Sequence, residues 1–362
     1  MNICLIGDGL TNLAFAKCLV KKNINVSLYY YSTSTKPLSN RTLGISSKNY
    51  DFFNNQILNI NKLCWPIEKI RIYNEKNKCK EILSFGENNK KLLYIFQNYK
   101  IYEKLQNSLK NKKNFKKIKI KNKIFYKNIL SNNKFDIVIN AEKNNLITKK
   151  IFYKKISKDY KSDAITLVIN HQKCKNNDAL QTFTSYGPLA FLPISKTKTS
   201  IVYSIYNFKK TNNQEIKNLI LKYNKNYKIK SFSKFEKFKL KFSLNRNYFY
   251  KNIMNFGDNL HSIHPLAGQG FNMTIRDIKI FLEIIENNLS LGLPLDNSIL
   301  KDFEIKTKHL NYIFSNGIDF IHEFFKFKSF GDLPINILKR FENNKLFKKH
   351  FIRIADKGFD NY

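Results

Sequence analysis

Glycine, aspartate and asparagine gather in one segment of the chain, Gly257 to Asn272. The segment follows a short apolar stretch at 253–256 that predicts a strand, and it leads into a helical repeat of apolar residues. Asp258 can accept hydrogen bonds from sugar hydroxyls. Gly268 and Gly270 open the predicted helix, whose free N–H groups and dipole favour a negative or electron-rich ring. The segment therefore predicts a polar cradle for a bound ligand.

A second cradle is predicted at the start of the chain, where an apolar stretch runs into Gly7-Asp8-Gly9-Leu10-Thr11-Asn12. Gly7 and Gly9 let the backbone approach a pyrophosphate at the N-terminus of the following helix. Two positions depart from the usual dinucleotide pattern. Asn12 replaces the third glycine, and Tyr30 ends the second strand, where an acidic residue normally binds the ribose. We therefore expect a dinucleotide whose adenosine is bound more weakly or in a different arrangement.

His261 and His264 invite a metal site with Asp258 as a third ligand. The HxxH spacing beside a proline does not place two imidazoles on one helix face, and no further cluster of Cys, His or Glu completes the site. We expect no metal, and we expect a histidine to pack or hydrogen-bond within the loop. The sequence shows no Ser-His-Asp arrangement and no paired carboxylates for glycoside chemistry. This pattern indicates that a cofactor carries the difficult chemical step.

The composition is that of a folded, strongly basic protein. The 362 residues are 43% hydrophobic and carry a net charge of +37. Only six of the 64 basic residues are Arg, so drift toward Lys, Asn and Ile explains much of this charge, and attraction to an anionic membrane surface is the alternative. We expect no nucleic-acid partner, because no basic-aromatic recognition motif is present. Scattered cysteines, the lack of a signal peptide and the lack of a membrane span predict a cytoplasmic protein, or one peripheral on the inner face of the membrane.

The order of the predicted elements gives the fold class. Residues 3–30 predict the βαβ opening of a parallel sheet, 93–109 a helix, and 116–125 a strand with one wet face. From about 163 to 250 the apolar period changes to 2, which predicts an antiparallel sheet. We therefore expect an α/β fold (α+β with an inserted antiparallel sheet). Its predicted parts are a discontinuous Rossmann-like dinucleotide-binding domain at 1–50, 92–162 and 251–300, a β-sheet substrate domain at 51–91 and 163–250, and a C-terminal helical segment at 301–362.

With both cradles considered together, the chain resembles the FAD-dependent aromatic-ring hydroxylases of the p-hydroxybenzoate hydroxylase type. It is most similar to the ubiquinone-biosynthesis hydroxylases within that group. Five further segments match the family's pattern, and the resemblance runs from residue 3 to about 356: Arg41–Ser46, Pro66–Ile70, Tyr94–Asn98, Gly187–Pro193 and Ser315–Gly317.

The resemblance implies a monooxygenase that uses FAD, NAD(P)H and O2 to hydroxylate a polyprenylated phenol in ubiquinone biosynthesis. In that family, the reduced flavin forms a C4a-hydroperoxide that transfers oxygen to the ring. The first glycine turn holds the pyrophosphate, the Gly-Asp pair holds the ribityl chain, and the glycine loop lies against the flavin ring. The residues expected to bind the cofactor are Gly7, Gly9, Leu10, Thr11, Arg41, Gln97, Asp258, Pro265, Gly268, Gly270, Phe271 and Asn272.

One family motif is badly altered in this chain. After the strand ending at Ile139, the family has an Asp-Gly pair near the pyrophosphates, whereas this chain has Asn140-Ala141-Glu142-Lys143. Glu142 preserves the charge, and Lys143 replaces the glycine. Together with Tyr30, this loss supports an alternative reading, in which the chain is a degenerate paralogue that serves as a non-catalytic subunit of a ubiquinone-biosynthesis assembly.

A substrate with an isoprenoid tail would be drawn from a bilayer. The helical pattern from Leu310 to Phe325 and the mixture of aromatics and Lys from Phe324 to Phe330 suit docking on anionic lipid. The alternative for Leu310 to Ile321 is an ordinary core stripe. The sequence thus predicts the later aromatics as the better candidates for lipid contact.

Overall fold

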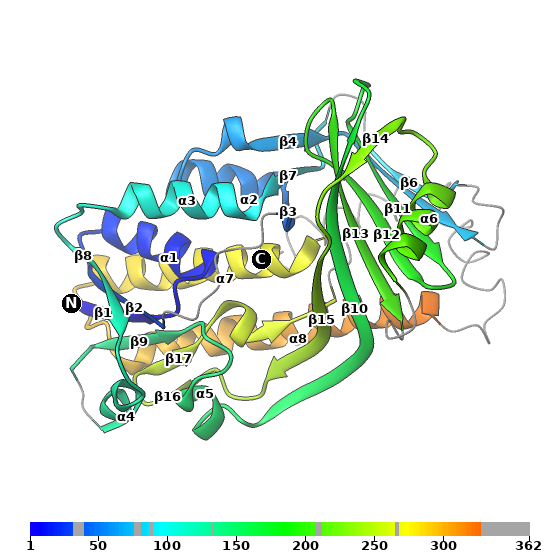
Figure 1. Ribbon diagram of the computed structural model, residues 1–362. Helices are drawn as coiled ribbons and strands as arrows, with labels where there is room; N and C mark the ends of the chain where they lie inside the picture. Colours follow the sequence, from blue (N-terminus) through cyan, green and yellow to red (C-terminus); the bar gives the residue numbers. More distant parts are fainter. Residues whose placement is uncertain are drawn as a thin grey trace.

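A computed structural model describes residues 1–31, 40–75, 81–86, 90–131, 134–206, 212–264 and 268–326. It shows a mixed α/β fold with a mainly parallel sheet in one half and a large antiparallel sheet in the other (Figure 1). This confirms the predicted fold class. Pro265 and the residues after 326 lie outside the described residues, as do the side chains of Phe324 and Phe325.

The first sheet carries the βαβ opening that the sequence predicts. Its strand order is β16-β17-β9-β1-β2-β8, and every pairing except β16 with β17 is parallel. The carboxyl ends of β1, β9 and β17 therefore meet at one edge, although they come from distant parts of the sequence. The strands are β1 (Asn2–Ile6), β2 (Asn25–Tyr31), β8 (Phe115–Ile120), β9 (Ile137–Asn140), β16 (Phe249–Tyr250) and β17 (Ile253–Asn255).

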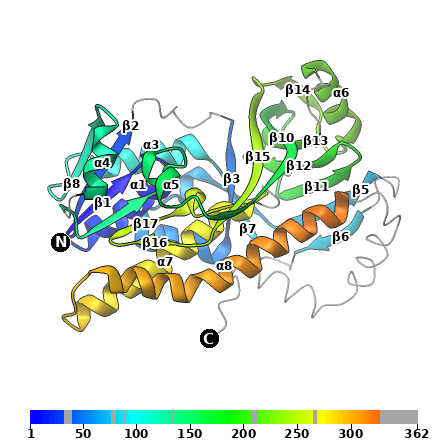
Figure 2. The same cartoon turned by 90° about the horizontal axis from the view of Figure 1, so that it is seen from below.

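Helices cover this sheet because each presents one apolar face. Residues of α1, α3 and α7 form a single core with β1, β9 and the segment after α2, and Phe15 of α1 packs on Phe256 and Phe281 with ring centroids 5.4 Å away in both cases. α8 packs along α7 and runs from the first sheet toward β5 and β6 (Figure 2). The helices are α1 (Leu10–Lys21), α2 (Ser47–Phe52), α3 (Asn98–Leu109), α4 (Ile124–Ser131), α5 (Leu146–Lys150), α6 (Asn213–Tyr223), α7 (Gln269–Ser290) and α8 (Asn297–Lys326), with single turns at Phe53–Ile57, Asn61–Leu63 and Gly257–Asn259.

The antiparallel sheet matches the region where the apolar period changes to 2. Its strand order is β18-β15-β10-β13-β12-β11-β5-β6, with β14 also paired to β10, and α6 packs on one face. Every pairing except β11 with β5, which is parallel, is antiparallel. β10 is 17 residues long and pairs with β15 on both sides of a bulge between Asp159 and Asp163. The strands are β5 (Lys69–Asn74), β6 (Glu81–Phe85), β10 (Lys155–His171), β11 (Asp178–Thr184), β12 (Gly187–Pro193), β13 (Lys198–Tyr206), β14 (Ile229–Phe232), β15 (Glu236–Asn245) and β18 (His261–Ser262).

Two predicted elements differ from the structure. The helix expected over 93–109 begins only at Asn98, because Leu93–Gln97 forms β7 between β3 (Thr42–Ser46) and β4 (Cys64–Ile67). The strand expected over 116–125 ends at Ile120, and α4 begins at Ile124. In the first case tertiary pairing on both edges of β7 overrides a helical pattern.

The division into domains stays a prediction. One segment of the predicted substrate domain packs instead with the predicted dinucleotide-binding domain. Phe53, Ile57 and Ile60 fall in the predicted substrate domain at 51–91. Their side chains are fully buried in the same core as β1 and α1. We therefore group the turns after α2 with the first sheet.

Candidate functional site

The first glycine turn joins β1 to α1. Gly7 has a φ of +98°, which favours glycine, and its N–H donates to the carbonyl of Tyr29 at 2.8 Å. Gly9 is the N-cap of α1 and offers no side-chain cap to the helix. A Cβ built on Gly9 would meet nothing within 4 Å. The N-terminus of α1 therefore faces open space, as an anion-binding helix end requires.

Asn12, which replaces the third glycine of the dinucleotide pattern, is fully buried under this turn. Its Nδ2 donates to the carbonyl oxygens of Ile6 at 2.9 Å and Gly7 at 2.7 Å. The side chain thus fastens the end of β1 to the first turn of α1. In place of the tight packing that a glycine would allow, this chain uses two hydrogen bonds.

The two predicted cradles touch each other at Gly257 and Thr11. Gly257 has a φ of +59°, and a Cβ built on it would lie 2.7 Å from Cγ2 of Thr11. Only a residue without a side chain fits there, because the 3-10 turn Gly257–Asn259 rests directly on the first turn of α1. The contact brings the carboxylate of Asp258 to the same edge as the open N-terminus of α1.

Asp258 presents a half-exposed carboxylate flanked by cations. Its side chain is 49% exposed, and Nζ of Lys143 lies 3.9 Å from its Oδ2. Partial desolvation acts to raise the pKa of Asp258, but the charges of Lys143 and Arg41, with a smaller share from His261, outweigh it and lower that pKa. The carboxylate is therefore an ionised acceptor at neutral pH. Lys143 also donates to Oγ of Ser262 at 3.2 Å, so the residue at the altered family motif stands beside the predicted ribityl site.

A buried network of amides supports the turn that carries Asp258, and in the sequence only a general richness in Asn accompanies it. Nδ2 of Asn140 donates to Oδ1 of Asn255 and to Oγ1 of Thr148, both at 2.9 Å. Nδ2 of Asn145 donates to Oδ1 of Asn140 at 2.7 Å, and Nδ2 of Asn259 donates to Oδ1 of Asn255 at 2.9 Å. The network joins the ends of β9 and β17 to α5 and to the turn that carries Asp258. It holds the loop after β9 in place although the Asp-Gly pair is missing.

Glu142 in that loop is also held by the protein. Tyr126 donates to its Oε2 at 2.9 Å, and a Cβ built on Gly7 would come within 3.5 Å of the Glu142 Cβ. Desolvation, followed by the charge of Glu142, raises the pKa of Tyr126, so the phenol keeps its proton. The loop therefore lies directly against the first glycine turn.

The glycine loop before α7 is joined to β3. Gly268 has a φ of +66°, and a Cβ there would lie 3.1 Å from the backbone N of Gly44. Asn272 is 2% exposed; its Oδ1 accepts from the backbone N of Ser46 at 2.9 Å, and its Nδ2 donates to the carbonyl of Gly44 at 3.1 Å. Asn272 thus positions the loop through the backbone of β3. A Cβ on Gly270 would meet only Ile263, at 3.8 Å.

The remaining predicted cofactor residues divide between the edge of the site and the core. Arg41 and Gln97 lie at the neighbouring ends of β3 and β7, where the carbonyl of Arg41 accepts from the backbone N of Asn98 at 2.9 Å. Leu10 and Phe271 belong to the main core, and the Phe271 ring lies 5.7 Å from that of Phe96. The side chains of Leu10 and Phe271 pack in this core, and the charge of Arg41 lowers the pKa of Asp258. Contacts of these residues with a cofactor stay a prediction.

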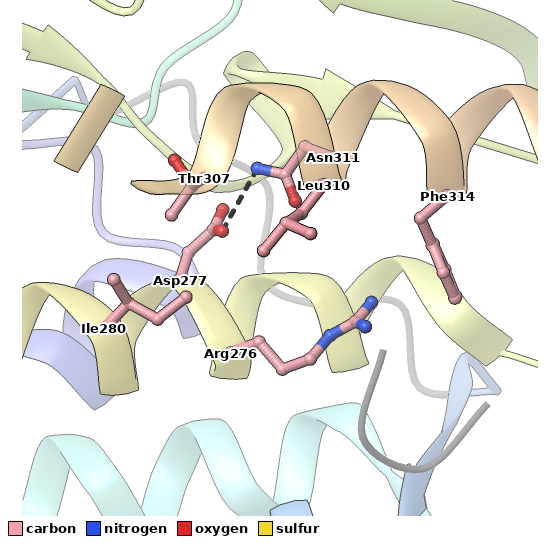
Figure 3. Close-up of a pocket in the computed structure, with 7 residues that line it drawn as sticks. All are labelled: Arg276, Asp277, Ile280, Thr307, Leu310, Asn311 and Phe314. Atoms are coloured by element: carbon pink, nitrogen blue, oxygen red, sulfur yellow. Dashed lines mark hydrogen bonds between the residues drawn. The ribbon is translucent and has the colours of Figure 1, made fainter. Parts of the chain in front are cut away.

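The histidines of the second motif separate in the structure. His261 is buried, and its Nε2 contacts Oδ2 of Asp277 at 2.5 Å. Asp277 faces α8, where Nδ2 of Asn311 donates to its other oxygen at 3.2 Å beside a small cavity between α7 and α8 (Figure 3). This cavity lies between α7 and α8. His261 therefore has a packing and hydrogen-bonding role.

His264 lies where the glycine loop meets the antiparallel sheet and α8. Its ring stacks on His322 of α8 with centroids 4.1 Å apart, and Tyr160 of β10 is edge-on to it at 5.1 Å. Asp319, His322 and Glu323 form a group that could hold a metal ion. Nζ of Lys158 lies 3.1 Å from a carboxylate oxygen of both Asp319 and Glu323, so an ammonium already supplies the positive charge there.

Comparison with known proteins supports the resemblance over part of the chain. No protein-family model matches it. It is 28% identical over 160 residues to the 3-demethoxyubiquinol 3-hydroxylase of Escherichia coli (strain K12), a match that covers 41% of each protein. It is 34% identical over 94 residues to the mitochondrial ubiquinone biosynthesis monooxygenase COQ6 of Dictyostelium discoideum, covering 26% of this chain and 19% of that protein. The matched stretches thus span less than half the length of these curated relatives.

The fold extends the likeness to the whole chain. The crystal structure of p-nitrophenol 4-monooxygenase PnpA from Pseudomonas putida DLL-E4 superposes with a TM-score of 0.78 at 9% sequence identity, covering 98% of both chains. At that identity the superposition establishes the fold alone.

Proposed function

We propose that this chain is an FAD-dependent monooxygenase of the flavoprotein aromatic-ring hydroxylases, related to the ubiquinone-biosynthesis hydroxylases that it resembles over part of its length. The observation that carries the proposal is the contact of Gly257 with Thr11. Through this contact the ionised carboxylate of Asp258 lies near the N-terminus of α1, a pair that suits the sugar hydroxyls and the pyrophosphate of a flavin dinucleotide. The amide network holds the turn that carries Asp258.

The residues present fit FAD. The pyrophosphate would lie at Gly7 and Gly9 before α1, the ribityl chain at Asp258, and the flavin ring beside the loop from Pro265 to Gly270. Bound FAD would supply the redox chemistry, which is acceptance of a hydride from NAD(P)H and activation of O2 toward an electron-rich ring. The task of this chain is to orient that ring and to exclude water from the reaction.

The proposed substrate is a polyprenylated phenol. Support comes from the printed names of two relatives, a 3-demethoxyubiquinol hydroxylase and a ubiquinone biosynthesis monooxygenase. The position of Lys143 supports a second candidate function, because its ammonium lies near Asp258, the expected acceptor for the ribityl chain. In that case the chain is a non-catalytic subunit of a ubiquinone-biosynthesis assembly.

Purified protein is expected to bind one FAD and to consume NAD(P)H and O2 when a short-chain prenylated phenol is added. The measurements are the flavin absorbance, the oxidation rate, and the incorporation of oxygen from labelled O2 into the phenol. Flavin without turnover would favour the non-catalytic subunit. Protein that stays colourless with excess FAD would end the monooxygenase proposal.

We also propose that α8 docks on an anionic membrane surface. None of the described helices has the length and apolar character needed to cross a membrane. Phe314 of the predicted stripe belongs to the core, since it is only 6% exposed. Ile313 of the same stripe is exposed. Its position along α8 puts it on one side of the helix with Ile305, Tyr312 and Phe320, and all four side chains are at least 50% exposed. Exposed Lys301, Lys306 and Lys308 share the helix.

Replacing Ile305, Tyr312 and Phe320 by Ser is expected to abolish pelleting with anionic vesicles at low salt, because the apolar contact is lost while the charge is kept. Flavin content should not change. Leu221→Ser is the matched control, since Leu221 of α6 is 49% exposed on a different helix. Equal pelleting of the triple variant and the wild type would leave charge alone as the cause of binding.

A further inference from the structure

The end of β2 carries Tyr30 where dinucleotide-binding folds place a ribose-binding acid, yet a carboxylate stands nearby. Asp8 lies between Gly7 and Gly9, and its side chain is 10% exposed. Its Oδ2 accepts from the hydroxyl of Tyr102 at 3.2 Å and pairs with Nζ of Lys117 at 3.1 Å. An acid in a phosphate-binding loop repels the phosphate unless a cation such as Lys117 offsets its charge.

Lys117 shows where this carboxylate lies. Lys117 belongs to β8, which pairs with the far side of β2 from β1. Its Nζ is 4.5 Å from the centroid of the Tyr30 ring and also reaches Asp8 at the end of β1. The ion pair therefore crosses over the carboxyl end of β2. The carboxylate of Asp8 thus stands at the edge where an acid on β2 would otherwise be.

Asp8 is held in a defined orientation. Nε2 of Gln106 donates to the hydroxyl oxygen of Tyr102 at 2.7 Å, which leaves the Tyr102 proton to point at Asp8. Desolvation, followed by the charge of Asp8, raises the pKa of Tyr102, so this donor keeps its proton. Both contacts use Oδ2. Among the residues that the structure describes, Oδ1 has no hydrogen-bond partner.

We propose that Asp8 accepts hydrogen bonds from the ribose hydroxyls of the adenosine, in place of the acid missing from β2. Tyr102 and Lys117 are positioning residues that hold its carboxylate. This inference rests on the proposed function in that it takes FAD as the dinucleotide. It explains how a chain with Tyr30 retains an adenosine site.

The test compares ADP with 2′,3′-dideoxy-ADP, measured by calorimetric titration of the whole protein. Wild type is expected to bind ADP about 10-fold or more tightly than the dideoxy analogue, the scale of a hydrogen bond to a charged group. In Asp8→Asn the preference should fall to within about 2- to 3-fold, because the charged acceptor is gone. An unchanged preference in Asp8→Asn overturns the inference.

Tyr30→Glu gives an independent check that does not disturb the glycine turn. A new carboxylate at residue 30 would compete with Asp8 for Lys117, so ADP and FAD should not bind more tightly. Tighter binding of both ADP and FAD would show that the ribose is bound by the residue at position 30 of β2, and the inference would be wrong. Binding of ADP without FAD would defeat the monooxygenase while leaving the ADP comparison valid, and binding of neither would defeat both.

Discussion

Asp258→Ala is expected to bind FAD about 10- to 150-fold more weakly than the wild type. The estimate follows from the loss of a hydrogen bond to a charged acceptor, about 1.5–3 kcal/mol. Lys143 and Arg41, whose charges act on Asp258, remain and still attract the pyrophosphate, so binding should weaken without disappearing. Fluorescence titration of FAD measures the change.

Asp302→Ala is the matched control, because Asp302 is an exposed acid of α8 that makes the same change of net charge away from the turns. It should leave the dissociation constant of FAD unchanged. Since the cations lower the pKa of Asp258, its carboxylate stays ionised even at a pH near its ordinary pKa, so wild-type affinity for FAD should show no titration of Asp258 between about pH 6 and 8. Equal affinity of Asp258→Ala and wild type would remove Asp258 from the site.

Gly257→Ala is expected to lower the free energy of unfolding by about 2–4 kcal/mol and to reduce FAD binding with it. Alanine is strained at a φ of +59°, and its Cβ would lie 2.7 Å from Cγ2 and 2.9 Å from Oγ1 of Thr11. Strain and overpacking each cost about 1–3 kcal/mol. Because the contact joins the two turns, pushing them apart moves Asp258 away from the N-terminus of α1. Chemical denaturation and FAD titration report the two effects.

Thr11→Ala in the same chain should recover part of the loss, because the two atoms nearest the new methyl group are removed and the Thr11 Cβ lies 3.3 Å away. The residual cost is the backbone strain. Gly317→Ala serves as control: a Cβ there meets nothing within 4 Å in the middle of α8, so it should raise helix stability slightly. A double variant no better than Gly257→Ala would place the damage elsewhere than at Thr11.

The sequence predicts those parts of the site that are formed by residues consecutive in the chain. The turn at Gly7 and Gly9 and the turn at Gly257 and Asp258 both follow short apolar strands, and both occur as expected. Their mutual contact could not be predicted, because it depends on β1, β9 and β17 lying side by side in the sheet. The helix predicted for residues 93–97 is wrong for the same reason. The segment forms β7, whose partner strands β3 and β4 are distant in sequence.

Asn140 and Asn255 show a second limit. In a chain rich in Lys, Asn and Ile, each asparagine carries little information, and a buried one is not distinguished from an exposed one by its neighbours. Both are fully buried here and hydrogen-bonded to each other across 115 positions of sequence. Asp8 is similar, because its role depends on Tyr102 and Lys117 from other elements.

The amide network below the turns contains Asn140, Asn145, Asn255, Asn259 and Thr148, none of which gains or loses a proton in the ordinary pH range. An acid at these positions would make the geometry of the network depend on pH. In a protein of net charge +37 it would also make that geometry depend on ionic strength. Because amides carry no charge, the network does not respond to pH or to ionic strength. The turn that carries Asp258 should therefore keep its place when pH or salt changes the charge at the surface.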